Sequence, residues 1–297
     1  MLHTVINKGM RQVASLALFF LSPEQKRGME RRLRGREEHR KLSQADCVVV
    51  SFGKSGRTWL RVMLSRYYQL RFGLSEKNLI GFDNLNRKNA EIPRIFFTHD
   101  NYLADFTGNA DNKRDFYDTK VVLLVRSPQD VAVSQFFQWK FRMKQHKKTL
   151  NRYPLDPELP IFDFVMSEEA GIPKICDFMN LWAEELPRMK NMLVVRYEDM
   201  RSDTATHLAK VVELLDGRAE ADHVAGAVEF ATVENMRQLE TGSAFRSGRM
   251  KPGDKSNPDS FKVRRAKVGG YRDYFEDDQV KLIDALVQER LSPVFGY

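Results

Sequence analysis

Cysteine and long apolar runs are both scarce in this sequence of 297 residues. The two cysteines, Cys47 and Cys176, have no neighbouring cysteine or histidine cluster, which argues against a disulfide framework and a zinc site. The longest apolar run near a terminus, residues 13–21, is far shorter than the roughly 20 residues that cross a bilayer. We therefore predict no transmembrane helix, no metal, and a reducing, cytoplasmic compartment.

The sequence also lacks a neutral charge balance. Lysine and arginine number 48 against 40 acidic residues, a formal net charge of +8. Such an excess favours anionic partners: nucleotides, sulfated or phosphorylated substrates, nucleic acid or an acidic membrane surface. No aromatic platform or recognition-helix motif accompanies the basic runs, so we expect no nucleic acid partner.

Basic residues are densest between Lys26 and Lys41. We predict that residues 1–45 form a basic helical extension that precedes the folded domain. Two interpretations of it stay open. An amphipathic helix could make a peripheral contact with an acidic membrane surface, or a charged helix could simply be solvated.

Short β-branched runs alternate with longer amphipathic segments in the rest of the chain, a rhythm typical of a parallel α/β sheet. The expected strands are Cys47–Ser51, Arg94–Thr98, Lys120–Val125 and Met192–Arg196. The expected helices are Arg57–Phe72, Pro128–Lys147, Pro173–Met189, Thr204–Leu215 and Asp277–Arg290. No repeat or linker divides them, so we predict a single α/β domain over residues 46–297, with a central parallel sheet flanked by helices.

A phosphate-binding loop is indicated where the first expected strand turns into a helix. Residues 51–59 place Gly53 and Gly56 around Lys54, so backbone N–H groups, a helix N-terminus and a mobile cation can converge on a phosphate. The loop for ATP and GTP has the pattern GxxxxGK[ST], and its first glycine would fall on Val48. A phosphate ligand other than an ordinary nucleoside triphosphate is therefore favoured, and a kinase that uses ATP and magnesium stays an alternative.

The same loop resembles a known family. The run Gly53-Lys54-Ser55-Gly56-Arg57-Thr58-Trp59 is similar to the PKSGTTW loop of sulfotransferases that use 3′-phosphoadenosine 5′-phosphosulfate (PAPS). The resemblance implies a P-loop-like α/β fold, a sulfotransferase domain over residues 46–297, and binding of the 5′-phosphosulfate by this loop. It also implies that Trp59 stacks on the adenine. Arg57 stands where the family has threonine and adds a second charge.

Further segments extend the resemblance in the same order along the chain. Arg126 at a strand end and Ser134 about two helical turns later could hold one anion, and they match the family's VRNPxDVAVS segment, whose Arg and Ser bind the 3′-phosphate. Arg264 and Arg265 match the basic pair of its RKGxxGDWK segment, which contacts the same phosphate, although Ala266 stands where glycine is usual. Tyr197 matches the tyrosine of its YED segment, which approaches the adenine.

The chemistry of sulfuryl transfer requires a base for the acceptor and a cation for the leaving oxygen. The resemblance assigns the base to His99, which follows the second strand, and Lys54 is the natural electrophile. Phe97 and Asp100 depart from the family pattern, KTHL, around this histidine. From Asp100 we expect a polar, carboxylate-lined mouth that suits a sugar, a glycolipid or an aminoglycoside-like acceptor.

We therefore predict a PAPS-dependent sulfotransferase that acts on an acceptor hydroxyl and releases 3′-phosphoadenosine 5′-phosphate (PAP). The acceptor could be a small molecule or a glycan. A membrane-surface binding protein that uses its basic segments is a further alternative, and the location would then be cytoplasmic at a membrane surface. Residues 151–160 and 241–260 are expected to be surface loops, the second a candidate lid. The oligomeric state is not predicted.

Overall fold

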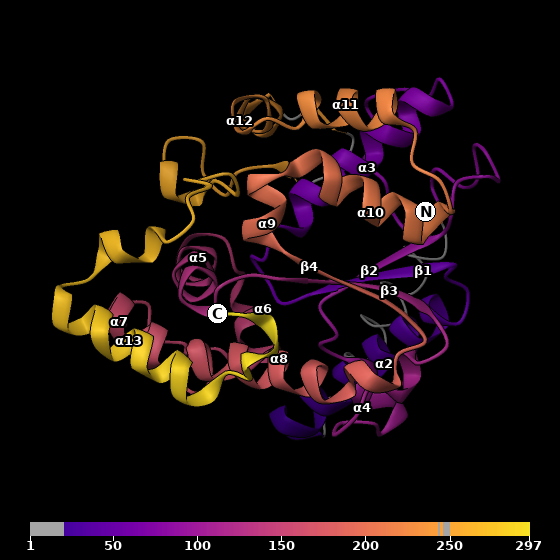
Figure 1. Cartoon of the computed structure of the whole chain (residues 1–297). Helices are drawn as coiled ribbons and strands as arrows, with labels where there is room; N and C mark the ends of the chain where they lie inside the picture. The colour runs from indigo at the N-terminus through magenta and orange to yellow at the C-terminus, as the bar shows by residue number, and fades with distance from the viewer. Residues whose placement is uncertain (1–20, 243, 246–249) are drawn as a thin grey trace.

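The computed structural model describes residues 21–242, 244–245 and 250–297. In this part of the chain, four strands form one parallel sheet in the order β2-β1-β3-β4. The strands are β1 (Cys47–Ser51), β2 (Ile95–Thr98), β3 (Lys120–Val125) and β4 (Asn191–Arg196). Because all four run the same way, their carboxyl ends meet at one edge of the sheet (Figure 1).

Helices cover both faces of the sheet, which explains the apolar strand sequences (Figure 1). Every residue of β1 is buried, with Cys47 and Val49 in one core cluster and Val48 and Val50 in the other. The first face is covered by α3 (Arg57–Arg71), α10 (Thr204–Asp216) and α11 (Ala221–Phe230). The second is covered by α5 (Pro128–Phe141), α8 (Ile172–Glu185) and α13 (Asp277–Arg290).

The expected single α/β domain with a central parallel sheet is confirmed, and each expected strand lies within one residue of its predicted bounds. Two helix predictions are wrong in extent. The helix expected over Pro128–Lys147 is divided into α5 and α6 (Gln145–Leu150), because Arg142 leaves the helical conformation and its side chain binds distant carbonyl oxygens. The helix expected to reach Met189 ends at Glu185, followed by a 3-10 turn that contains Pro187.

The basic segment before β1 forms α2 (Pro23–Leu42), which begins with a capping box between Ser22 and Gln25. It packs closely on α4 (Leu103–Thr107), since a Cβ atom at Gly35 would lie 2.1 Å from the carbonyl oxygen of Tyr102. Leu42 joins the core of the second face. Residues 1–20 of the predicted extension lie outside the described residues. Over the described ranges, no helix has the length and apolar character of a membrane span.

Shorter helices complete the chain: α7 (Ile161–Met166), α9 (Tyr197–Ser202) and α12 (Val233–Thr241). The loop expected at 151–160 contains no helix or strand. Part of the candidate lid at 241–260, residues 243 and 246–249, lies outside the described residues. The described part ends in a 3-10 turn at Pro258–Ser260.

Candidate functional site

A cavity of about 990 Å³ opens at the carboxyl edge of the sheet. It is the place where ligands bind in open parallel sheets, because loops from several strands end there. Residues directly after all four strands line it: Phe52 after β1, His99 after β2, Arg126 after β3 and Tyr197 after β4. The structure thus brings together residues that lie far apart in the sequence.

The loop after β1 has the backbone of an anion-binding turn. Lys54 and Gly56 both take left-handed conformations, with φ of 73° and 94°. Gly56 is the N-cap of α3 and offers no side-chain cap to the first N–H groups of the helix, whose residues Arg57 and Thr58 line the cavity. Only glycine fits at 56, since a Cβ atom there would lie 2.6 Å from the ring of Tyr197. Thr58 and Trp59 line the cavity from α3, whereas Ser55 is buried beside it.

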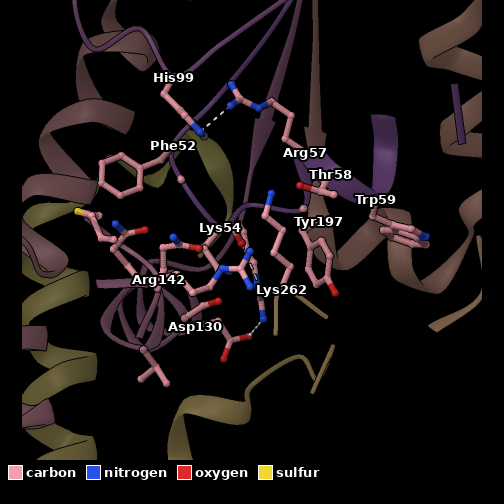
Figure 2. A pocket seen from close by; sticks show the side chains of 18 of the residues that line it. Phe52, Lys54, Arg57, Thr58, Trp59, His99, Asp130, Arg142, Tyr197 and Lys262 are labelled. Carbon is pink, nitrogen blue, oxygen red and sulfur yellow. Dashed lines mark hydrogen bonds and ion pairs between the residues drawn. The ribbon is translucent and has the colours of Figure 1, made fainter. Parts of the chain in front are cut away.

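Lys54 lies in a cluster of positive side chains, shown in Figure 2 together with Lys262 and Arg142. Burial is the main cause that lowers the pKa of Lys54 to about 7, and repulsion from Lys262 and Arg142 adds to it. Burial, and next the charge of Arg142, lower the pKa of Lys262 to about 8, and Arg61 and Arg57 add to the effect. Cations held together at this cost favour an anionic ligand, which would restore the charged form of both lysines.

His99 is held as a neutral imidazole. Its Nδ1 lies 2.8 Å from the carbonyl oxygen of Ser51, which can only accept, so Nδ1 carries the proton. Its Nε2 lies 2.5 Å from the guanidinium of Arg57, which can only donate (Figure 2). Burial, and next the charge of Arg57, hold the pKa of His99 well below its usual value. The lone pair that a general base needs is therefore on Nε2, against Arg57.

Hydrogen bonds hold the side chain of Arg126 between the 53–59 loop and the C-terminal segment. Its guanidinium donates to Asp130 at 3.1 Å and to the carbonyl oxygens of Lys267 at 3.0 Å and Lys54 at 3.4 Å. It also lies 4.4 Å from the centre of the Tyr197 ring. Its Nε is buried and has no partner in the described structure. Ser134 lines the same cavity from α5.

Arg264 and Arg265 line the cavity but bind protein partners. Arg264 stacks at 3.7 Å on the ring of Phe137 and pairs with Asp259, whereas Arg265 pairs with Asp273 at 2.6 Å. The next residue, Ala266, has a φ of 54°, a left-handed conformation that glycine adopts without strain. The backbone turn that the glycine pattern provides is thus present in spite of the alanine.

The aromatic pair expected at the adenine lies in contact. Trp59 and Tyr197 meet edge to face, with ring centres 5.9 Å apart. The indole N–H of Trp59 donates to the carbonyl oxygen of Ala231 at 2.8 Å, which fixes the ring at the cavity wall. The predicted site residues therefore line one cavity, with Ser55 as the exception.

Sequence reasoning missed two buried carboxylates that hold the C-terminal segment in place. Asp130 accepts hydrogen bonds from Arg126 and from the backbone N–H groups of Gly269 and Tyr271. Glu240 is fully buried and accepts from Arg142 and from the N–H groups of Lys262 and Val263. Asp130 could have been found from the sequence, since it lies inside the 126–134 segment that resembles the family pattern. Glu240, and Lys262 whose backbone it holds, could not have been found, because no local motif surrounds them.

Carboxylates do line the cavity, as expected from Asp100, since Glu38, Asp100 and Asp105 are among its lining residues. The carboxylate of Asp100 is only 4% exposed and pairs with Lys113 at 2.6 Å, so its charge is neutralised by a partner that does not line the cavity. Burial raises the pKa of Asp100, against the lowering effect of Lys113. Within residues 21–242, 244–245 and 250–297, no cluster of His, Cys, Asp and Glu side chains could hold a metal ion.

Comparison with known proteins gives a family and related sequences. The sulfotransferase domain family matches residues 44–295. Cytosolic sulfotransferase 15 of Arabidopsis thaliana is 24% identical over 284 residues, covering 86% of this chain and 74% of its own. Amine sulfotransferase of Oryctolagus cuniculus is 24% identical over 258 residues, covering 83% and 81%.

Solved structures share the fold. The crystal structure of mouse sulfotransferase SULT7A1 complexed with PAP superposes with a TM-score of 0.58 at 20% identity, covering 86% of this chain and 89% of that one. Retinol dehydratase in a complex with retinol and PAP gives a TM-score of 0.57 at 16% identity, covering 82% and 80%. The likeness in both cases is one of fold.

Proposed function

The chain belongs to the sulfotransferase domain family, and from this premise we propose that it moves a sulfuryl group from PAPS to an acceptor hydroxyl and releases PAP. One observation carries the proposal. The uncapped N-terminus of α3, with Lys54 beside it, shares a single cavity with Arg126 and Ser134. Two anion-binding groups in one cavity suit a nucleotide that carries phosphate at both its 5′ and 3′ positions.

The residues present fit PAPS. The Nε atoms of Arg126 and Arg142 are buried without a partner among the described residues, so each has a donor left for a phosphate oxygen. Burial and neighbouring cations lower the pKa of both Lys54 and Lys262, with Arg142 acting on each, and an anion would reverse this effect. When bound, PAPS supplies the sulfuryl group and a phosphate leaving group. No metal is required for this chemistry.

In the proposed mechanism the protein positions the donor, neutralises the charge of the leaving group and removes a proton from the acceptor. The 53–59 loop and the amides of α3 hold the 5′ end, and Lys54 neutralises the charge that grows on the leaving oxygen. The 3′ end is held by Arg126, Ser134, Arg264 and Arg265. Arg264 and Arg265 would exchange their carboxylate partners for phosphate. Trp59 and Tyr197 offer their aromatic faces to the adenine.

His99 is the proposed general base. Its Nδ1–H is fixed by the carbonyl oxygen of Ser51, which orients the ring and leaves Nε2 as the acceptor of a proton. Arg57 covers Nε2 in this structure. The base can act only when Arg57 turns away from the ring, and an anionic group at the N-terminus of α3 gives the guanidinium a stronger partner than a neutral imidazole.

The test is calorimetric titration with PAP, ADP and ATP with magnesium. Arg126→Ala should weaken PAP by about 30-fold, equal to about 2 kcal/mol for a lost charge-assisted contact, and leave ADP unchanged because ADP has no 3′-phosphate. Arg272→Ala is the matched control, since Arg272 pairs with Asp284 and does not line the cavity. If ATP with magnesium binds as tightly as PAP, the kinase alternative replaces the proposal.

The proposal for the acceptor rests only on the names of relatives and fold neighbours. Relatives are named for amine and flavonol acceptors, and one fold neighbour holds retinol. We infer a small-molecule acceptor, with a carbohydrate or glycolipid as a narrower hypothesis. A cytoplasmic location is supported by the names of the plant relatives. Contact of the basic N-terminal extension with a membrane stays a prediction.

A further inference from the structure

The cavity has a second lining, away from Lys54, that is rich in positive charge. It is made by α2, by α4 with the loop before it, by the α6 segment with the loop after it, and by α8. We name it the outer lining. Among the described residues, its cationic members are Arg31, Lys144, Lys147, Arg152 and Lys174. Its acidic members among them are Glu38, Asp100 and Asp105.

The acidic members are already occupied. Asp105 pairs with Arg31 at 2.8 Å, and Asp100 pairs with Lys113, which does not line the cavity. Glu38 accepts hydrogen bonds from Thr98 and Tyr102. Burial, and next the charge of Asp100, raise the pKa of Glu38 to about 7, so its negative charge is partly lost at neutral pH. The outer lining therefore has a positive excess.

Lys174 and Arg152 carry this excess where a ligand can use it. The ammonium of Lys174 donates to the carbonyl oxygens of Glu169 at 2.7 Å and Asn151 at 3.1 Å, and it lies 4.4 Å from the centre of the Tyr153 ring. These contacts fix its position and leave a third N–H for a ligand. Neither Lys174 nor Arg152 forms an ion pair with a carboxylate of the described chain.

Arg152 adds a strained backbone to the same place. Its φ is 57°, a conformation that costs a side-chain-bearing residue energy and that is concentrated at functional sites. Its charge also acts on Lys174. Burial and the charge of Arg31 are the larger causes that lower the pKa of Lys174 to about 8, and Arg152 adds to them. Arg152 and Lys174 thus repel each other at the cavity wall, and the exposed carboxylate of Glu169, which favours the charged form of Lys174, is an ion-pair partner of neither.

We propose that the acceptor carries an anionic group, a carboxylate, sulfate or phosphate, which Lys174 and Arg152 bind while the acceptor's hydroxyl reaches His99. This inference rests on the proposed function, because it concerns the acceptor end of the same cavity. It opposes the cationic, aminoglycoside-like acceptor that the sequence suggested. A cationic acceptor would meet the positive excess and be repelled.

The experiment first saturates the protein with PAP, so that the cations around Lys54 are covered and an added anion must use the outer lining. Calorimetry then compares matched probes: phenol with 4-hydroxybenzoate, and glucose with glucuronate and glucose 6-phosphate. The anionic member of at least one set should bind about tenfold tighter than its neutral partner. The preference should shrink as salt is added.

Two variants locate the preference. Lys174→Met removes one charge, and Arg152→Asn removes the other with a residue that tolerates the left-handed backbone if Lys174→Met fails to fold. Each should cut the preference several-fold. Lys190→Met is the control, since Lys190 is an exposed lysine paired with Asp118 outside the cavity.

The outcomes are separable. Equal binding of every matched set, or no binding of any probe, overturns the proposal. A preference of unchanged size in both Lys174→Met and Arg152→Asn also overturns it, because the anion would then bind elsewhere. Failure of PAP itself to bind is a different result, which overturns the proposed function.

Discussion

Binding of PAP should draw protons onto the lysines of the nucleotide site. Without ligand, the pKa is about 7 for Lys54 and about 8 for Lys262, both far below the usual lysine value of about 10.4. The groups that act on Lys54 come from several elements: Lys262 and Arg126 from loops, Arg142 from the end of α5 and Glu240 from α12. Of these only Glu240 favours the charged form.

The size of the uptake follows from these values. At pH 8, a lysine with a pKa of about 7 is roughly 90% neutral, and one with a pKa of about 8 is half neutral. A phosphate ligand favours the ammonium form and raises both pKa values, so the bound state holds more protons. Binding at pH 8 should then take up more than one proton. Above pH 8 the affinity should fall as pH rises, by up to about tenfold per pH unit for each whole proton.

The assay is calorimetry of PAP binding in Tris and in HEPES, whose ionisation enthalpies differ. The dependence of the observed heat on buffer enthalpy gives the number of protons. Lys262→Arg should lower it by about half a proton, since arginine stays charged, and Lys255→Arg, an exposed lysine that does not line the cavity, should not. An affinity that stays flat between pH 7 and 9, with no buffer dependence, would refute the reasoning.

Three further predictions concern the frame of the site. Gly56→Ala should lower the free energy of unfolding by at least about 1 kcal/mol and weaken PAP binding, because φ is 94° and the Cβ meets the Tyr197 ring; urea titration and calorimetry measure the two effects. Ala266→Gly should leave the thermal midpoint unchanged or higher, whereas Ala266→Val should lower it, since the left-handed φ strains a branched side chain most. Glu240→Gln should cost about 3 kcal/mol in urea unfolding, because the charge of Arg142 loses its buried partner.

The sheet could be predicted from the sequence because its strands are buried on both faces. A strand such as β3, with Val121 to Val125 all buried, reads as one β-branched and aliphatic run whose ends are marked by charge. The division of α5 from α6 could not be predicted. It depends on Arg142 reaching the carbonyl oxygens of Lys251 and Ser260, more than a hundred positions later.

The site was predictable where a motif is local. The loop at 53–59 and the segment from Arg126 to Ser134 carry their spacing in consecutive residues, and both line the cavity. Glu240 and Lys262 act through the fold: the carboxylate on α12 holds the backbone that presents the lysine. The state of Asp100 could not be predicted for the same reason: it lines the cavity, but its charge is cancelled by Lys113, a partner that no spacing rule connects to it.

The contact of Arg57 with His99 bears on the proposed role of His99 as the general base. In this structure the guanidinium both covers Nε2 and lowers the pKa of the ring. An anion at the N-terminus of α3 would attract the same guanidinium more strongly than a neutral imidazole does. Its departure would expose the lone pair, and the anion's charge would offset the repulsion that makes His99 a weak base. Under the proposed function, the nucleotide would thereby prepare the base, and Arg57 would couple donor binding to proton removal.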